Sequence, residues 1–148
     1  MSADGKIGAK ELSRQLARIC TRTGQGFPSR SRHQHIVLGG VTLGIPADRP
    51  LDERELNERL QTWLRDVGPA VEIDHVSLRR RLVDHGYLVR DAAGVAYRVD
   101  PGWIAARFEP EVAGLDPATI VAEATAARER RKQEHLRRRA EQPPDEPG

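Results

Sequence analysis

Apolar side chains recur at helical spacing in the middle of the chain. Four of them lie three or four positions apart or side by side, as residues do on one face of an α-helix: Leu56, Leu60, Trp63 and Leu64. Asp52 precedes them as an N-cap with Glu55 completing a capping box, and Gly68 and Pro69 follow as a helix breaker. The pattern predicts a helix that begins at Glu53 and ends at this breaker.

Similar signals follow residue 72. Asp74 is a candidate N-cap, and we predict a helix from His75 to about His85, with Gly86 as the C′ residue that ends it. Two strand-like runs come next, at 87–90 and 95–99, separated by turn-rich residues. These runs predict a β-hairpin.

Two further helices are expected before residue 45. Residues 31–43 contain a run of apolar side chains, although Gly39 and Gly40 each disfavour a helix by about 1 kcal/mol relative to alanine. Residues 10–23 place their apolar side chains on one stripe, which is formed by Leu12, Leu16, Ile19 and Cys20. Both segments are therefore predicted to be helical.

The C-terminal part of the chain predicts one long helix. Asp116 and Pro117 form an N-cap and a first-turn proline, and the helix is expected to reach Arg139. Beyond Ala127 its only apolar side chain is Leu136. We therefore expect the last turns to project into solvent or to lie on a partner.

The order helix, helix, helix, hairpin is that of a winged helix-turn-helix domain. The predicted fold class is mainly α with a small β-hairpin, in which a winged helix-turn-helix-like core is flanked by N- and C-terminal helices. We divide the chain into a basic helix and linker (1–26), the winged-helix-like domain (27–110), a long basic helix (111–140) and a tail (141–148). The tail holds three prolines and no apolar anchor from residue 142 onward, so we expect it to be disordered.

Charge is distributed unevenly, although the chain of 148 residues has a net charge of only +2. Residues 12–35 contain five arginines and no acid, and residues 128–139 contain seven bases against two acids. Residues 46–74 between them contain eight acids against four arginines. Basic ends around an acidic middle are typical of proteins that bind polyanions.

The predicted fold indicates which side chains would contact nucleic acid. In a winged helix the third helix enters the major groove and the hairpin forms the wing. The polar face of helix 75–85 presents Ser77, Arg80, Arg81 and Asp84, and arginines there can donate to phosphates or to guanine. The hairpin adds Arg90 and Arg98. The basic ends add Arg30, Arg32, Arg128, Arg130, Arg131, Lys132, Arg137, Arg138 and Arg139. The alternatives are a solvated helix face and a charged hairpin edge that deters aggregation.

Arg79 differs from its neighbours because it falls within the apolar arc of its helix, where an unpaired guanidinium is costly. The preceding acidic helix offers Glu55 and Glu58 as partners. We therefore predict a structural ion pair between Arg79 and one of these two acids.

The residues resemble a bacterial family catalogued as domain of unknown function 2087. The resemblance spans about residues 27–99 and is carried by Phe27-Pro28-Ser29, by 53–60, by Asp74-x-x-x-Leu78-Arg79-Arg80-x-Leu82-Val83-Asp84-x-Gly86-x-Leu88-x-Arg90 and by Gly94-x-x-Tyr97. Members occur alone or attached to helix-turn-helix regulators. The resemblance therefore implies a winged-helix-like fold and a regulatory setting. Residues 65–73 form a longer link between helices than is usual in the family.

Other classes of function find little support in the sequence. His33 and His35 are two residues apart and so fall on different helix faces, while His75, His85 and His135 have no acid or cysteine at ligand spacing. Neither a phosphate-binding glycine loop nor a nucleophile elbow is present. A lone cysteine, Cys20, makes an intramolecular disulfide impossible, and its place on an apolar stripe indicates a buried, inert thiol. We expect no catalytic residue, metal or cofactor, no membrane association and a cytoplasmic location.

The sequence thus favours a non-enzymatic nucleic-acid-binding protein, with a small bacterial DNA-binding regulator as the leading interpretation. We expect DNA more than RNA as the partner, while the charge distribution favours a polyanion over an adaptor and does not choose between the two nucleic acids. An RNA- or ribosome-associated protein is the first alternative, since a projecting arginine-rich helix also suits folded RNA. The second is a protein–protein adaptor, in which the C-terminal helix pairs with a partner protein or with a second copy of the chain.

Overall fold

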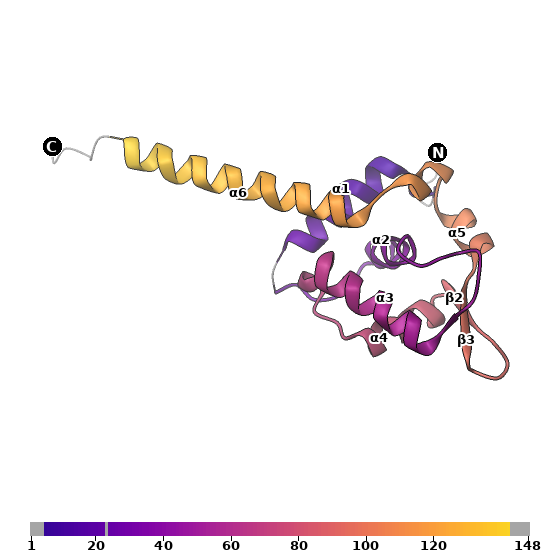
Figure 1. The fold of residues 1–148 in the computed structure, drawn as a ribbon. Coiled ribbons are helices and arrows are strands. Elements are labelled where there is room, and N and C mark those ends of the chain that lie inside the picture. Colours follow the sequence, from indigo (N-terminus) through magenta and orange to yellow (C-terminus); the bar gives the residue numbers. More distant parts are fainter. Residues whose placement is uncertain (1–4, 23, 143–148) are drawn as a thin grey trace.

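The computed structural model describes residues 5–22 and 24–142, which form a helical domain with one small sheet (Figure 1). The α-helices are α1 (Ala9–Thr21), α2 (Ser31–Thr42), α3 (Glu53–Asp66), α4 (His75–Asp84), α5 (Pro101–Arg107) and α6 (Pro117–Glu141). The strands are β1 (Leu51–Asp52), β2 (Leu88–Arg90) and β3 (Ala96–Val99), and two 3₁₀ turns are η1 (Pro69–Val71) and η2 (Pro110–Gly114). The predicted fold class, mainly α with a small hairpin, is confirmed.

The central part of the chain has winged-helix order, from α2 through β1, α3, α4, β2 and β3. The hairpin strands β2 and β3 are antiparallel, with Leu88 opposite Val99. The short strand β1 joins the other edge of β3, where Leu51 lies opposite Tyr97, so the sheet has the order β1-β3-β2. The sequence predicted only the hairpin, because a strand of two residues is too short to show alternation.

Aspartate side chains cap the N-termini of α3, α4 and α6, at the three positions that the sequence predicted. Asp52 accepts a hydrogen bond from the backbone N–H of Glu55 at 2.7 Å, and Asp74 accepts one from Ser77 at the same distance. Asp116 caps α6 in the same way by accepting from Ala118 at 3.1 Å. Each carboxylate satisfies an N–H group that has no partner within its helix. These caps set the first residues of α3, α4 and α6.

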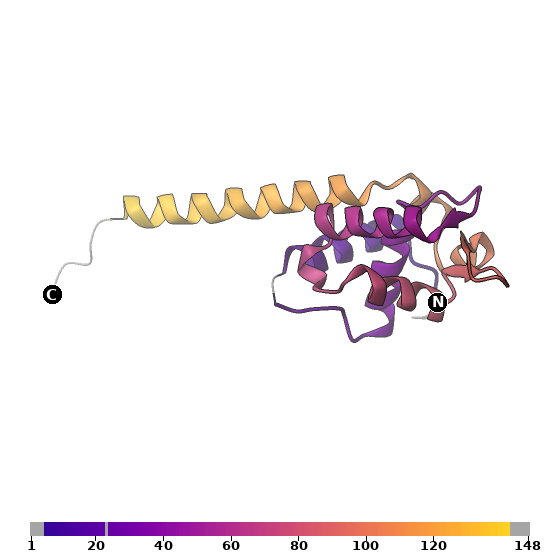
Figure 2. The same ribbon diagram turned by 60° about the horizontal axis from the view of Figure 1, so that its bottom comes forward.

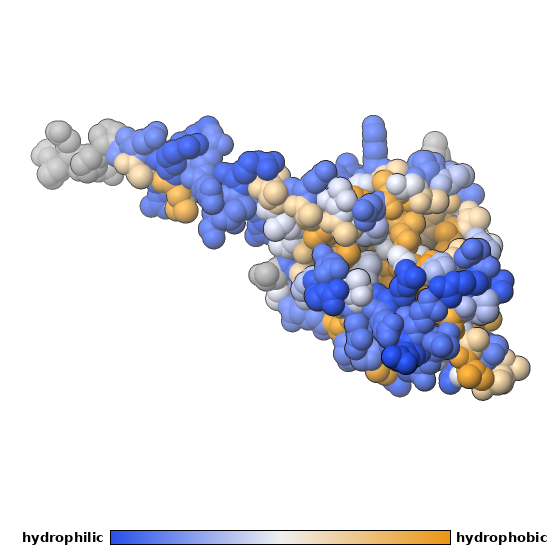
Figure 3. Space-filling model, viewed as in Figure 1, coloured by the Kyte–Doolittle hydropathy of each residue, from blue (hydrophilic) through white to orange (hydrophobic). Residues whose placement is uncertain are grey.

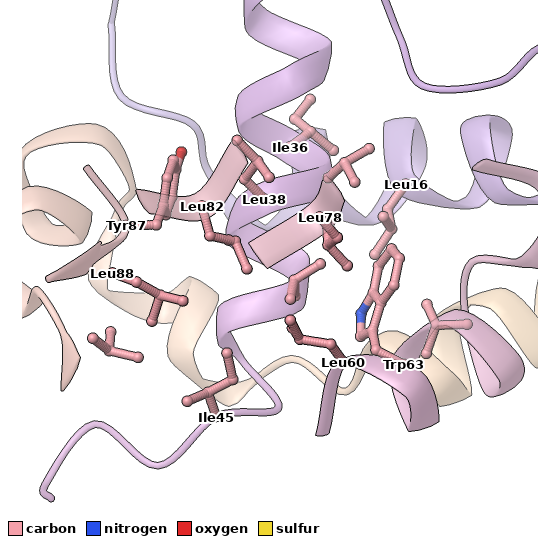
Figure 4. Packing of buried hydrophobic residues seen from close by; sticks show 14 of the residues in the cluster. Leu16, Ile36, Leu38, Ile45, Leu60, Trp63, Leu78, Leu82, Tyr87 and Leu88 are labelled. Atoms are coloured by element: carbon pink, nitrogen blue, oxygen red, sulfur yellow. The ribbon is translucent and has the colours of Figure 1, made fainter. Parts of the chain in front are cut away.

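One hydrophobic core unites the flanking helices with the winged helix (Figure 4). Leu16 of α1 and Trp63 of α3 approach α2 from one side, while Leu78 and Leu82 of α4 lie near Leu38. The helix α1 therefore contributes to the same core as residues 27–110, from which the sequence analysis had divided it. Residues 143–148, which hold most of the predicted tail, lie outside the described part of the chain.

The segment after the hairpin contains α5 and η2, which the sequence analysis did not predict. Asp100 caps α5 by accepting from the backbone N–H of Trp103. After α5, Phe108 forms a parallel bridge with Ile7, and the Ile7 N–H donates to the carbonyl of Arg107 at 2.8 Å. This bridge fixes the start of the described chain beside the end of α5.

The long helix α6 projects far beyond the domain, as both ribbon views show (Figures 1 and 2). Its first turns pack against α1, and Val121 is buried there. From Arg128 to Glu141 every side chain is exposed, and Leu136 remains 54% exposed. The expectation that the last turns leave the core is confirmed.

Gly86 ends α4 in the left-handed conformation, with φ of +87°, as its predicted C′ position requires. A Cβ at Gly86 would lie 2.8 Å from the indole of Trp103. Glycine is therefore needed here both for the backbone conformation and for the close approach of α5.

Replacing Gly86 with alanine is expected to lower the free energy of unfolding by at least about 1 kcal/mol, because the backbone becomes strained and the methyl group overlaps Trp103. Urea denaturation measures this loss. Gly114→Ala is the control, since its Cβ would meet nothing within 4 Å, and we expect a change within about 0.5 kcal/mol. Equal effects of the two substitutions would contradict this role of Gly86.

Candidate nucleic-acid interface

The third helix of the winged helix, α4, presents Arg80 and Asp84 to solvent. Ser77 has a structural role at the start of this helix, because its hydroxyl donates to Asp74 at 2.9 Å. The same aspartate caps the helix, and its hydrogen bonds with Ser77 hold the pKa of its carboxyl below the usual range. Of the predicted contact residues on α4, Arg80 and Asp84 are therefore the most open to a ligand.

Arg81 packs on the loop before α2 instead of lying free on the solvent face. Its guanidinium carbon lies 4.1 Å from the centre of the Phe27 ring, and the side chain is half-buried. The prediction that Arg80 and Arg81 share an open face is thus corrected for Arg81. Stacking on an aromatic ring leaves the edge of a guanidinium available to an anion. The contact also joins α4 to the loop 24–30.

A basic pocket of about 500 Å³ lies between the end of α1 and the start of α2, where residues 25–30 of this loop line it; we call it the α1–α2 pocket. Its basic side chains are Arg18, Arg22, Arg30 and His33. Gln15, Ile19 and residues 25–29 complete the lining, which contains no acidic residue. Phe27 thus lines the pocket and also packs against Arg81 of α4.

A second basic hollow, of about 680 Å³, runs between α1 and α6; we call it the α1–α6 groove. It shares Arg18 and Arg22 with the pocket, and α6 adds Arg128, Arg131, Lys132 and His135. Arg128 donates to the backbone carbonyl of Thr21 at 2.7 Å and so covers the end of α1. No acidic residue lines this groove either.

The pocket and the groove join into one surface because they share two arginines. We call it the basic band, and it comprises Arg81, Arg30, His33, Arg18, Arg22, Arg128, Arg131, Lys132 and His135. Neither Arg18 nor Arg22 was singled out as a site residue, because their place on an amphipathic helix indicated only a generally cationic face. Their spacing of four residues within the predicted helix 10–23 was the available signal. In the structure Arg22 is the residue that directly follows α1, in an extended conformation.

The projecting part of α6 has basic side chains on more than one face. Arg131, Lys132 and His135 line the groove, and Arg139 follows at the next helical turn on the same side. Arg130 and Arg137 face the other way, and Arg138 is paired with Glu134 at 2.7 Å. Figure 3 shows this part of the helix as a mostly hydrophilic surface. The basic side chains of residues 128–139 therefore lie on two faces of α6, one that continues the basic band and one that does not.

Three other predicted contact residues have different surroundings. Arg90 folds back within the hairpin and donates to the carbonyl of Gly94, at 3.1 Å from Nη2, while Arg98 is exposed. Arg32 is held by Glu11, whose Oε1 accepts from Nη2 at 2.7 Å, and Arg32 lowers the pKa of that carboxyl. The structure thus brings neither Arg90 nor Arg32 into the basic band.

Arg79 is paired, but with Glu53 and Asn57 instead of the predicted Glu55 or Glu58. Its guanidinium lies 3.2 Å from the carboxylate of Glu53 and donates to the Asn57 side-chain oxygen at 2.6 Å. Glu53 and Asn57 are four residues apart and face α4, whereas Glu55 and Glu58 are turned away to other arginines of their own segment. The ion pair between α3 and α4 exists, and its acidic partner is corrected.

His35 makes a polar contact in the interior that sequence reasoning missed. Its Nδ1 lies 2.7 Å from the hydroxyl of Tyr87, and the ring of His85 is 6.1 Å away. Burial lowers the pKa of His35, and the nearby Arg107 and His85 lower it further. The sequence analysis had assigned no role to His35. His35 instead serves the packing of α2 against the segment after α4.

No group of three or more metal-ligating side chains occurs among the described residues. Cys20 is buried in the core as predicted, and burial raises the pKa of its thiol to about 12. In residues 5–22 and 24–142, no helix is long and apolar enough to cross a membrane.

The order of elements, the sheet pairing and the exposed α4 define a winged-helix domain with helical extensions. Residues 25–99 match the family described as an uncharacterized protein conserved in bacteria, DUF2087, and the chain belongs to this family. The match ends at Val99, so α1, α5 and α6 lie outside it. Neither the curated proteins nor the solved structures contain a significant match to the chain.

Asn57→Ala is expected to lower the free energy of unfolding by about 1–2 kcal/mol, because it removes a hydrogen bond to a largely buried guanidinium. Chemical denaturation with urea provides the measurement. Glu58→Ala on the same helix should change stability by no more than about 0.5 kcal/mol, since Glu58 is exposed and pairs only with exposed Arg54. A larger loss for Glu58→Ala than for Asn57→Ala would show that this assignment of partners is wrong.

Proposed function

We propose that this protein binds nucleic acid without catalysing a reaction, and that it is a small DNA-binding regulator. One observation carries the proposal. The α1–α2 pocket and the α1–α6 groove, whose linings contain no acidic residue, extend from Phe27 to the projecting half of α6. Phe27 also carries Arg81 of α4, the helix that enters the major groove in winged-helix proteins. A surface of this length and charge matches the phosphate backbone of a duplex.

The charges in the band are available to a polyanion because acids elsewhere are already paired. On α3, Glu53, Glu55 and Glu58 each lie within ion-pair distance of an arginine. Among the described residues, by contrast, no carboxylate bonds the side chains of Arg18, Arg22 and Arg30. These three acids of α3 are thus engaged by arginines, whereas Arg18, Arg22 and Arg30 are open to an anionic ligand.

The two parts of the surface have different roles in this proposal. Arg80 on α4 is placed to donate to base edges, with Asp84 beside it, because both side chains are exposed on the helix that would enter the groove. The arginines and lysine of the band hold phosphates, which fixes orientation without reading sequence. The exposed part of α6, residues 128–141, extends roughly 20 Å and would follow the backbone beyond the domain.

RNA binding is the alternative within the same class, since an exposed arginine-rich helix also suits folded RNA. A protein–protein adaptor is the alternative from another class, and the exposed Leu136 on α6 is the observation that favours it. The adaptor, unlike DNA or RNA binding, predicts that the protein binds neither nucleic acid at low salt.

The experiment compares two double variants of α6 that remove equal charge. Arg131→Gln with Lys132→Gln alters the groove face, whereas Arg130→Gln with Arg137→Gln alters the other face. Fluorescence anisotropy with a short mixed-sequence duplex, at several salt concentrations, gives the affinity and its salt dependence. We expect the groove-face variant to lower the slope of log K against log salt by up to about 2, because two phosphate contacts are lost.

The control variant should lose less than half as much of this slope. Equal losses would mean that α6 attracts polyanions only through its net charge, which contradicts the arrangement proposed here. The same titration with a hairpin RNA compares the two nucleic acids, and tighter binding of RNA would favour that alternative. Absence of binding to both at low salt would overturn the proposal in favour of the adaptor.

A further inference from the structure

The α1–α2 pocket is more than a stretch of basic surface, because its arginines converge on a hollow. Arg18 and Arg22 enter from the end of α1, while Arg30 and His33 enter from the start of α2. The volume of about 500 Å³ falls within the range of small-molecule sites in proteins. A polyanion that merely lies along the band would leave much of this volume unfilled.

The backbone at the start of α2 adds to the positive potential of the pocket. Arg30 is the N-cap residue and makes no side-chain cap, and no acidic residue occurs in the first turn. The first N–H groups of a helix point away from its N-terminus and favour an anion there. In α3, α4 and α6, an aspartate occupies this place, so the start of α2 is different.

Gln15 supplies a polar group of another kind in the same pocket. Its side-chain oxygen is buried and has no hydrogen-bond donor in the described structure. A buried acceptor of this kind is costly when no donor meets it. A ligand hydroxyl would supply the missing donor if the Gln15 side chain turned its oxygen toward the pocket that this residue lines.

From these three observations we infer that the α1–α2 pocket binds the phosphoryl group of a small phosphorylated ligand, with Arg18, Arg22 and Arg30 on the phosphate and Gln15 on a ligand hydroxyl. Two sources supply this chemistry, a free sugar phosphate or nucleotide and the 5′-phosphate of a nucleic-acid strand. Because Arg18 and Arg22 also belong to the basic band, an occupied pocket lowers the affinity of the band for nucleic acid. The regulatory consequence rests on the proposed function, whereas binding of the free ligand does not.

The test begins with the full chain and ribose 5-phosphate in isothermal titration calorimetry, with pyrophosphate as a second probe. Arg30→Gln removes a pocket arginine that lies outside the α1–α6 groove, and we expect it to weaken both probes about tenfold. Arg14→Gln removes the same charge from an exposed position on α1 outside the pocket, and it should leave the affinities within about twofold. Thermal unfolding checks that both variants remain folded.

Saturable binding that is weakened by Arg30→Gln and not by Arg14→Gln supports the pocket. The pocket proposal is overturned if the two variants weaken binding of the probes equally, or if no saturable binding occurs in the millimolar range. The double variant Arg131→Gln with Lys132→Gln should leave the affinity for ribose 5-phosphate unchanged while it weakens binding of the duplex. The result therefore distinguishes failure of the pocket proposal from failure of the proposed function. Oligonucleotides with a 5′-phosphate and a 5′-hydroxyl separate the two sources, because only a site for a strand end prefers the phosphorylated one.

Discussion

The buried helix α2 is approached closely by its neighbours at two adjacent glycines. A Cβ on Gly39 would overlap the ring of Phe108, and a Cβ on Gly40 would lie 3.3 Å from Leu16. Close-packed interiors cannot absorb such overlaps without displacing the neighbouring element. The segment after α5 therefore reaches its place because α2 has no side chain at Gly39, and α1 packs tightly against Gly40. The two glycines disfavour the helical conformation, and the burial of every residue from Ile36 to Thr42 offsets this loss of stability.

This packing determines where the charges gather. Because Leu16 lies against α2, the polar side of α1 faces outward. Arg18 and Arg22 therefore lie between the start of α2 and the helix α6, and they line both the pocket and the groove. The basic band is thus a consequence of seating α1 on the winged helix. The matched family region ends before α5 and begins after α1, so the band combines a winged-helix surface with extensions outside the family region.

The sequence predicted the elements that have strong local signals. The caps at Asp52, Asp74 and Asp116 located three helices, and Gly86 located the end of one of them. The strand β1 and the helix α5 escaped prediction, because two paired residues and seven helical residues carry too little periodicity. Their positions depend on tertiary contacts, with Tyr97 and with Ile7 respectively, that no local pattern encodes.

The candidate interface was predictable in composition but not in arrangement. Charge counts indicated two basic ends, yet they could not show that Arg18 and Arg22 join these ends or that Arg32 is held by Glu11. Similarly, the burial of Arg79 indicated an acidic partner on the preceding helix. The choice of Glu53 over Glu55 depends on which face of α3 meets α4, and that is set by packing.

The central claim is that one continuous surface contacts nucleic acid, and backbone amide shifts in an NMR titration test it most directly. Adding a short duplex at low salt should shift the amides of residues 18–22, 25–33 and 77–84 and those along the groove face of α6, with little change in α3 or α5. Shifts confined to α3, α5 or the outer face of the sheet, or no shifts at all, would contradict the account.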